Sequence, residues 1–196
     1  MTSFAGLQLF TLLEPAKRTP AFLRDARSQD FSYPEVGATR GTLPDGYNID
    51  HNRVKLGQGS QVFRAAVSAL QSWEMFNVGW ARVYEPNTPI RVNATVAVVF
   101  RHFGFWSLNA LRIVYVIEEE RRCGFAYGTL RDHAEKGEER FCVEWDADTD
   151  SVYYDIFAFS KPRQWLVRFA SPIARMLQGR FVRDSQVAMK RAVREA

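Results

Sequence analysis

The pattern of apolar and polar positions predicts one short strand, one helix, six consecutive strands and a long final helix. After residue 60, apolar residues recur every three or four positions, which is typical of a helix that buries one face. They are Phe63, Ala66, Val67, Leu70 and Trp73. Alternating stretches predict a strand before this helix, at 47–56, and six after it, at 76–84, 91–102, 110–118, 123–130, 139–145 and 152–159. Short connections between the six strands indicate an antiparallel meander.

The last predicted element is a basic amphipathic helix that begins after Ser160-Lys-Pro162. Its apolar residues recur at helical spacing, and Pro172 interrupts the pattern. Either Pro172 kinks one continuous helix, or Ser171 caps a new helix with Pro172 in its first turn. From Lys161 onward there are nine Lys or Arg against Asp184 and Glu195, a charge of +7. The whole chain carries +4, so the remainder sums to −3 and the positive charge is concentrated at the C-terminal end.

The chain of 196 residues fits one domain with an N-terminal extension. We expect residues 1–32 to form this extension, with a helix that starts at Thr19-Pro20 and runs to Arg27. Gly- and Pro-rich stretches follow, and residues 33–196 are expected to form a single domain.

Composition narrows the class of protein without choosing a function. Hydrophobic residues make up 46% of the chain, and aromatic residues make up a high 14%, which suits either a large core or an apolar pocket. Cys123 and Cys142 have no metal-type spacing, so we expect no metal site and no cofactor. The first residues lack a secretion signal, and no stretch is long enough to span a membrane, so a soluble, cytoplasmic protein is expected.

Several strings resemble the uncharacterised family of domain of unknown function 1990, also called UPF0548. They are Tyr33-Pro-Glu-Val-Gly-Ala-Thr-Arg40, Gly57-Gln-Gly-Ser-Gln-Val-Phe63, Tyr127-Gly-Thr-Leu130 leading to His133 and Gly137-Glu-Glu139, and Phe159-Ser-Lys-Pro162. Together with the order of elements, this resemblance implies an α+β helix-grip fold of the START-like and pollen-allergen-like superfamily. In that fold a curved antiparallel sheet of about seven strands wraps around a long C-terminal helix. Such folds carry many functions, so the resemblance alone chooses none.

The first hypothesis is a protein that binds a hydrophobic or amphipathic small molecule, or a lipid, in a cavity between the sheet and the final helix. Aromatic rings would line the cavity, and an inward arginine would bind an anionic head group. An arginine on the solvent face needs no such role, and the sequence does not say which face is inside. The expected ligand-binding residues are Trp80, Arg82, Phe100, Tyr115, Tyr127 and Trp165.

The second hypothesis is a cyclase- or hydrolase-like enzyme that uses the same cavity. Tyr127 lies in a predicted strand, where side chains alternate between the two faces and its ring can point into the cavity. His133 lies in a polar loop with Gly137 and nearby glutamates. These two residues are therefore the candidate catalytic residues. Each also has a plain structural interpretation, as a core tyrosine and as an exposed loop histidine. We therefore favour a binding protein over an enzyme.

The third hypothesis is a peripheral membrane or partner-binding module. The basic final helix would then contact an anionic membrane surface, although a solvated helix face explains its charge equally well. No nucleic-acid-binding motif is present, so no nucleic-acid partner is expected. The sequence leaves the oligomeric state open.

Overall fold

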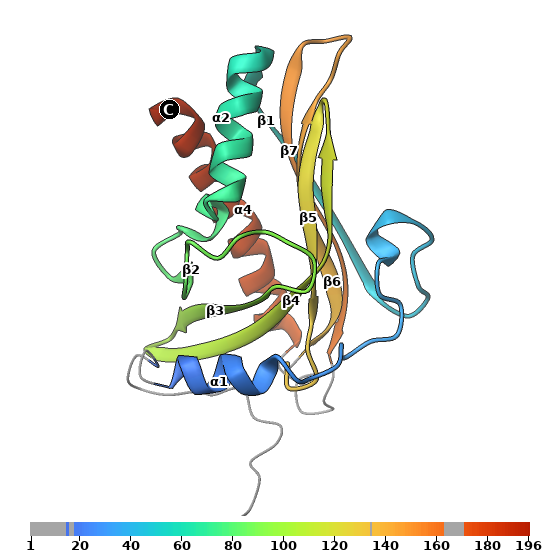
Figure 1. The fold of residues 1–196 in the computed structure, drawn as a ribbon, viewed down its shortest axis with the longest axis vertical. Coiled ribbons are helices and arrows are strands. Elements are labelled where there is room, and N and C mark those ends of the chain that lie inside the picture. Colours follow the sequence, from blue (N-terminus) through green and yellow to red (C-terminus); the bar gives the residue numbers. More distant parts are fainter. Residues whose placement is uncertain (1–14, 16–17, 134, 163–170) are drawn as a thin grey trace, which may run out of the picture.

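Within residues 15, 18–133, 135–162 and 171–196, which this computed structural model describes, seven antiparallel strands form one curved sheet (Figure 1). The strand order across the sheet is β1-β7-β6-β5-β4-β3-β2. The strands are β1 (Asn48–Gln58), β2 (Ala81–Val83), β3 (Thr95–His102), β4 (Phe105–Glu119), β5 (Arg122–Thr129), β6 (Glu135–Trp145) and β7 (Ser151–Pro162). The helices are α1 (Thr19–Ala26), α2 (Gly59–Gln71) and α4 (Ser171–Glu195), with short 3-10 turns η2 (Ala38–Arg40) and η3 (Glu74–Phe76).

The two faces of the sheet have different coverings. Helices α2 and α4 pack on its concave side, where they share one large hydrophobic core with the inward residues of β3 to β7. Helix α1 packs against β3 and β4 on the opposite side, through Leu23 and Ala26. The predicted order of elements and the antiparallel meander are confirmed.

The strand predicted over 76–84 is mostly wrong. Only β2, three residues long, has strand geometry there, and Phe76 belongs to η3. Trp73 and Gly79 adopt positive φ values of 61° and 80°, which turn the chain twice before β2 begins. Phe76 is buried against the helices instead of alternating along a strand, so its apolar character reflects tertiary packing.

The gap predicted between the strands at 91–102 and 110–118 is too wide, because β4 begins at Phe105. Strand β3 pairs as far as His102 with Phe105, which leaves a two-residue turn of Phe103 and Gly104. Both residues have positive φ, 51° and 84°, as the tightest hairpin turns require.

A β-bulge divides β4 into two halves that face opposite ways. The pairing with β5 shifts between Ile113 and Tyr115, so Val114 is an extra residue. Ile113 therefore points into the concave core, whereas Tyr115 and Ile117 pack in a small cluster on the convex face. The regular alternation that predicted the strand at 110–118 is therefore interrupted at Val114.

Helix α4 begins at Ser171, which agrees with the interpretation that Pro172 lies in the first turn of a new helix. Trp165, a predicted ligand-binding residue, lies outside the described residues.

Helix α1 is held on the sheet by Arg112 of β4. This side chain donates hydrogen bonds of 3.1 Å to the carbonyls of Ala26 and Arg27 at the end of α1. The division into an extension over 1–32 and a domain over 33–196 stays a prediction.

Candidate functional site: the concave face of the sheet

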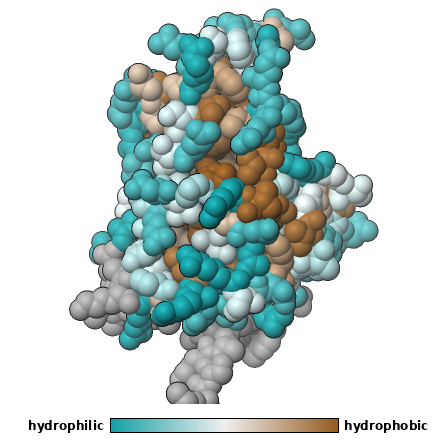
Figure 2. All heavy atoms as spheres, in the orientation of Figure 1, coloured by the Kyte–Doolittle hydropathy of each residue, from teal (hydrophilic) through white to brown (hydrophobic). Residues whose placement is uncertain are grey.

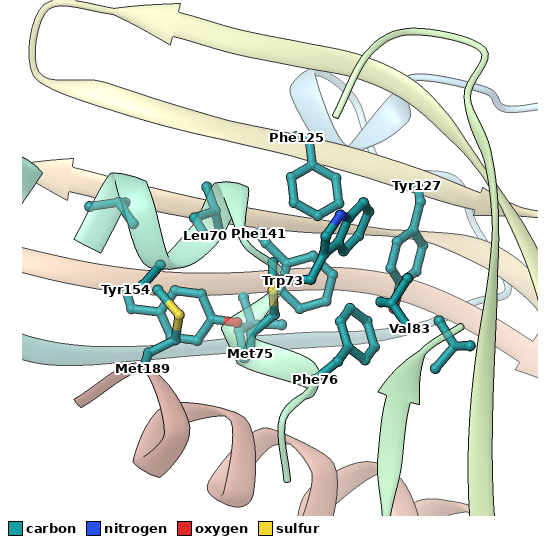
Figure 3. Close-up of a cluster of buried hydrophobic side chains, with 14 of the residues drawn as sticks. Leu70, Trp73, Met75, Phe76, Val83, Phe125, Tyr127, Phe141, Tyr154 and Met189 are labelled. Atoms are coloured by element: carbon teal, nitrogen blue, oxygen red, sulfur yellow. The ribbon is translucent and has the colours of Figure 1, made fainter. Parts of the chain in front are cut away.

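Aromatic side chains fill the middle of the concave face beneath the helices (Figure 3). The ring of Phe76 lies 5.2 Å from that of Phe181 on α4 and 5.8 Å from that of Phe141 on β6, measured between centroids. The ring of Tyr127 on β5 is tilted relative to that of Phe141, with 5.4 Å between centroids. These contacts occupy the centre of the space in which the sequence predicted a cavity, and they stabilise the fold by burying large apolar surfaces.

A hollow of about 270 Å³ opens beyond this cluster, between the end of α2, the loop from β2 to β3, and the β4–β5 hairpin. Figure 2 shows hydrophobic residues gathered on this face between α2 and the hairpin. The wall is mainly apolar, with a few polar groups at its edge. Its residues are Leu70, Gln71, Pro89, Ile90, Val116, Glu118, Cys123, Gly124 and Phe125.

The buried wall of the hollow is Phe125, which the aromatic core holds in place. The ring of Trp73 packs edge-on against Phe125, with 5.0 Å between centroids. The indole nitrogen of Trp73 donates a 2.9 Å hydrogen bond to the carbonyl of Thr88, which fixes the β2–β3 loop beside the hollow. The hollow is therefore bounded by a preformed wall.

The charged side chain that lines the hollow is that of Glu118, which is exposed at the edge of the hollow. Burial raises the pKa of the neighbouring Cys123 thiol, and the Glu118 carboxylate raises it further. The thiol is consequently protonated near neutral pH and a poor nucleophile. This arrangement suits binding an apolar molecule with an uncharged or cationic polar group.

A second polar group lies further along the same face, next to α4. The hydroxyl of Tyr127 donates a 2.5 Å hydrogen bond to Glu139 of β6. The amide of Gln178 on α4 donates to both carboxylate oxygens of Glu135, at 3.0 and 3.1 Å. Arg175 is paired with Asp50 of β1 at 2.5 and 2.8 Å, and its charge also lowers the pKa of Glu135 in part.

Burial raises the pKa of Glu139 to about 7, because the carboxylate loses hydration. The hydrogen bond from Tyr127 lowers that pKa in part, and the charges of Glu135 and Asp50 raise it. Burial also raises the pKa of Glu135. A carboxyl group that titrates near neutrality on an otherwise apolar face is a candidate acid–base group.

Glu139 is expected to make the protein less stable as the pH rises toward 8. Its pKa is raised by folding, so the folded state holds a proton that the unfolded state releases above about pH 4.5. That stabilisation is complete below pH 4.5 and is lost as the pH passes through 7. We expect Glu139→Gln to exceed the wild type in free energy of unfolding by less than about 1 kcal/mol at pH 5 and by about 3 kcal/mol at pH 8.

Urea denaturation at several pH values measures this difference. Glu120→Gln, which removes an exposed charge at the β4–β5 turn, is the control and should change the free energy of unfolding little at either pH. A constant difference between Glu139→Gln and wild type from pH 5 to 8 would contradict the assignment.

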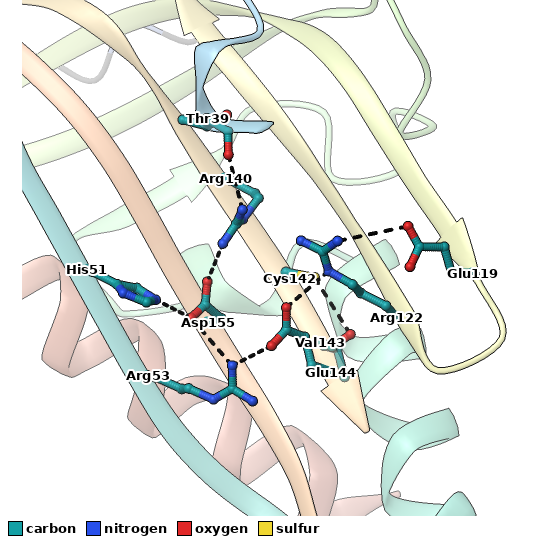
Figure 4. Close-up of polar contacts among 10 residues, drawn as sticks. All are labelled: Thr39, His51, Arg53, Glu119, Arg122, Arg140, Cys142, Val143, Glu144 and Asp155. Carbon is teal, nitrogen blue, oxygen red and sulfur yellow. Dashed lines mark hydrogen bonds and ion pairs between the residues drawn. The ribbon is translucent and has the colours of Figure 1, made fainter. Parts of the chain in front are cut away.

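The convex face carries a network of ion pairs (Figure 4). Asp155, which is 1% exposed, accepts hydrogen bonds from Arg140 at 2.8 Å and pairs with His51 at 2.6 Å. Arg53 bridges Asp155 and Glu144, and Arg122 reaches the other oxygen of Glu144 at 3.0 Å. These pairs join four neighbouring strands on the side of the sheet opposite α2 and α4, so we interpret them as structural.

Glu138 anchors the segment before β1 to the convex face. Its carboxylate, 3% exposed, accepts hydrogen bonds from the Tyr33 hydroxyl at 2.8 Å, the Gly37 amide at 2.7 Å and the Thr39 amide at 3.0 Å. The hydroxyl of Thr39 also bonds to it. Burial and the Glu138 charge raise the pKa of Tyr33, which therefore stays neutral and donates.

The structure divides the predicted ligand-binding residues between the two faces. Trp80, Phe100 and Tyr127 pack with the concave core, and the indole nitrogen of Trp80 donates to Asp184 at 2.7 Å. Tyr115 lies on the convex face, where its hydroxyl bonds to Thr39 at 2.6 Å. Arg82 is exposed and pairs in register with Val99, which packs toward α1 rather than into the concave core.

His133 and Tyr127 are not brought together. The side chain of His133 borders a crevice of about 10 Å³ beneath α1, which Phe22, Leu108 and Leu130 also line. Tyr127 faces the concave core on the other side of the sheet. No group of three His, Cys, Asp or Glu side chains is placed to hold a metal ion in the part of the chain that the structure describes.

Comparison with known proteins identifies the family. The model of the family described as domain of unknown function (DUF1990) matches residues 32–188. The chain belongs to the DUF1990 family. A UPF0548 protein of Deinococcus radiodurans is 36% identical over 196 residues, covering 94% of this chain and 98% of the relative.

Two solved structures share the fold of this DUF1990 protein. A Thalictrum norcoclaurine synthase point mutant in complex with a transition-state analogue has a TM-score of 0.51 and 12% identity, over 79% of this chain and 98% of that one. A START superfamily protein from Mycobacterium smegmatis has a TM-score of 0.50 and 14% identity, over 76% and 99%. Identities this low establish the fold alone, and the predicted START-like helix-grip fold is confirmed.

Sequence reasoning missed the residues that border the hollow and the inward glutamates of the DUF1990 chain. Glu139 had a usable signal, because it shares the inward register of Phe141 and Val143 on β6 and is thus a carboxyl on an apolar face. Ile90 had no such signal in the sequence, since it comes from an irregular loop.

No helix among the described residues is long and apolar enough to cross a membrane.

Proposed function

We propose that this DUF1990 protein binds a small, mainly apolar molecule in the hollow between α2, the β2–β3 loop and the β4–β5 hairpin. The observation that carries the proposal is the hollow of about 270 Å³ with walls of Leu70, Ile90, Val116 and Phe125. Its volume is close to the lower end of ligand pockets, roughly 300–1,000 Å³, and apolar walls with a few polar groups are typical of such pockets.

The lining also limits the ligand class. Glu118 is the charged residue among the described residues of the wall, so a fatty-acid carboxylate would meet repulsion there. An uncharged or cationic molecule avoids that repulsion and can donate a hydrogen bond to Glu118. The similar norcoclaurine synthase structure, which contains a transition-state analogue, supports the idea that this fold accommodates small molecules.

The hollow can be tested by filling it. Ile90→Trp places a larger side chain in the wall, and we expect it to weaken binding of the uncharged fluorescent probe N-phenyl-1-naphthylamine at least tenfold, or about 1.4 kcal/mol. Val92→Trp is the matched control, because Val92 is 52% exposed and does not line the hollow. Fluorescence titration measures both, and circular dichroism checks that each variant is folded.

Non-saturable emission with the wild type, or equal affinity in Ile90→Trp and wild type, would contradict the proposal. Solvent extraction of the purified protein followed by mass spectrometry then looks for the natural ligand. Recovery of fatty acids rather than neutral or cationic compounds would overturn the assigned ligand class.

A second candidate function is an enzyme of the cyclase or hydrolase type. Glu139, with a pKa of about 7 and a 2.5 Å hydrogen bond from Tyr127, supports it as an acid–base pair on the concave face. Compounds recovered by extraction can be incubated with wild type and with Glu139→Gln. Conversion by the wild type alone would favour this candidate, and conversion by neither would leave binding as the function.

A further inference from the structure

The turn between β3 and β4 carries two exposed aromatic side chains at its tip. Phe103 is 74% exposed and Phe105 is 47% exposed, although most large apolar side chains of the described residues are covered. Phe103 and Gly104 form the two-residue turn itself, so both rings lie at the extreme end of a hairpin. Exposing two neighbouring aromatic rings to water is unfavourable, which points to an interaction surface.

The hairpin beneath this tip is well packed. Next to the turn, His102 stacks on Phe100 at 5.7 Å and lies 4.9 Å from the ring of Trp80, measured between centroids. On the other strand, Trp106 packs against the cluster that joins β3 and β4 to α1. The exposed rings are therefore presented by a rigid support rather than by a loose loop.

Basic groups flank the tip on both sides. The guanidinium of Arg101 lies 5.5 Å from the ring centroid of Trp106. That of Arg180 lies 4.7 Å from the ring centroid of Trp80, and its Nε also pairs with Asp184 at 3.3 Å. Arg180 belongs to α4, which has six basic and two acidic residues. Aromatic rings beside arginines match the boundary of a bilayer, where apolar chains lie just below anionic phosphates.

We propose that the β3–β4 tip docks on an anionic lipid surface. Phe103 and Phe105 enter the boundary between head groups and acyl chains, and Arg101 and Arg180 contact lipid phosphates. A lipid surface fits better than a protein partner because two side chains at a hairpin end bury far less than the roughly 1,200 Å² of a stable protein interface. A membrane needs only a few apolar anchors together with cations.

Vesicle co-sedimentation tests the proposal. The full chain is mixed with vesicles of phosphatidylcholine alone, or of phosphatidylcholine with 30% phosphatidylglycerol, at low and high salt. We expect binding to the anionic vesicles that weakens with salt, and at least a tenfold loss of affinity in the double variant Phe103→Asn, Phe105→Ser. Asparagine suits the positive φ at 103. Val187→Ser, at a residue 61% exposed on α4, is the control and should bind as the wild type does.

Phe103→Trp gives an independent measurement. Its emission should shift to shorter wavelength on anionic vesicles and should be quenched by brominated lipids, whose quenching acts at short range. Absence of wild-type binding, or equal binding by the double variant and Val187→Ser, would overturn the proposal. Self-association of the wild type that the double variant lacks, without vesicle binding, would assign the tip to a contact between copies of the chain instead.

Discussion

Replacing Gly137 with alanine is expected to lower the free energy of unfolding by at least about 3 kcal/mol. Gly137 lies in β6 opposite Ser160 of β7, with a φ of 156°. A Cβ atom at this position would overlap the carbonyl oxygen of Phe159 and lie 2.9 Å from the Cα of Ser160. The neighbours are backbone atoms of the adjacent strand, which cannot move without breaking the pairing.

Gly179→Ala is the matched control. Gly179 lies inside α4, and its added Cβ would meet only the flexible end of Arg183 at 3.6 Å. Alanine is the better helix former, so this variant should gain about 0.5–1 kcal/mol. Urea denaturation compares the two. A Gly137→Ala protein that unfolds at the wild-type urea concentration would show that the two strands separate more easily than their pairing implies.

Replacing Glu138 with alanine is expected to cost about 4 kcal/mol, because it removes the acceptor for four donors from residues 33–39, three of which are buried. The segment that contains η2 should then detach from the convex face. Trypsin cleavage after Arg40, whose guanidinium now bonds to the Val116 carbonyl at 2.6 Å, should become several-fold faster.

Glu120→Ala provides the control for this experiment, since Glu120 is an exposed glutamate at the β4–β5 turn. It should change neither urea stability nor the cleavage rate appreciably. Unchanged trypsin sensitivity in Glu138→Ala would mean that other contacts, such as the ring of Tyr33 against Phe159 at 5.6 Å, hold the segment without the carboxylate.

The sequence predicted the fold where local periodicity and tertiary packing agree. The spacing of α2 reflects one buried face, and every second residue of β6 and β7, such as Phe141 and Tyr154, packs in the concave core, so both patterns predicted the elements correctly. The stretch 76–84 was predicted wrongly, because the side chains of Phe76 and Trp80 contact α4 and do not alternate along a strand. Gly137, expected in a turn, lies in β6 because it permits a close approach of β7.

The candidate site was predicted only in part, for a related reason. Aromatic residues such as Phe100 and Tyr127 do face the concave side, but side-chain packing fills that space. The hollow depends on how far α2, an irregular loop and the β4–β5 hairpin stand apart, which is a tertiary quantity that no local pattern encodes. The position of Tyr115 depended on a single bulged residue that alternation cannot detect.

The extra residue Val114 also determines which side chains of β4 border the hollow. Beyond it the inward positions of β4 have even numbers, so Val116 and Glu118 line the hollow, while Tyr115 and Ile117 face the other way. If Val114 were instead paired as an ordinary strand residue, alternation would turn the Tyr115 ring toward the space that Val116 now borders. One unpaired residue in β4 therefore determines that a valine and a glutamate, rather than a tyrosine and an isoleucine, border the hollow.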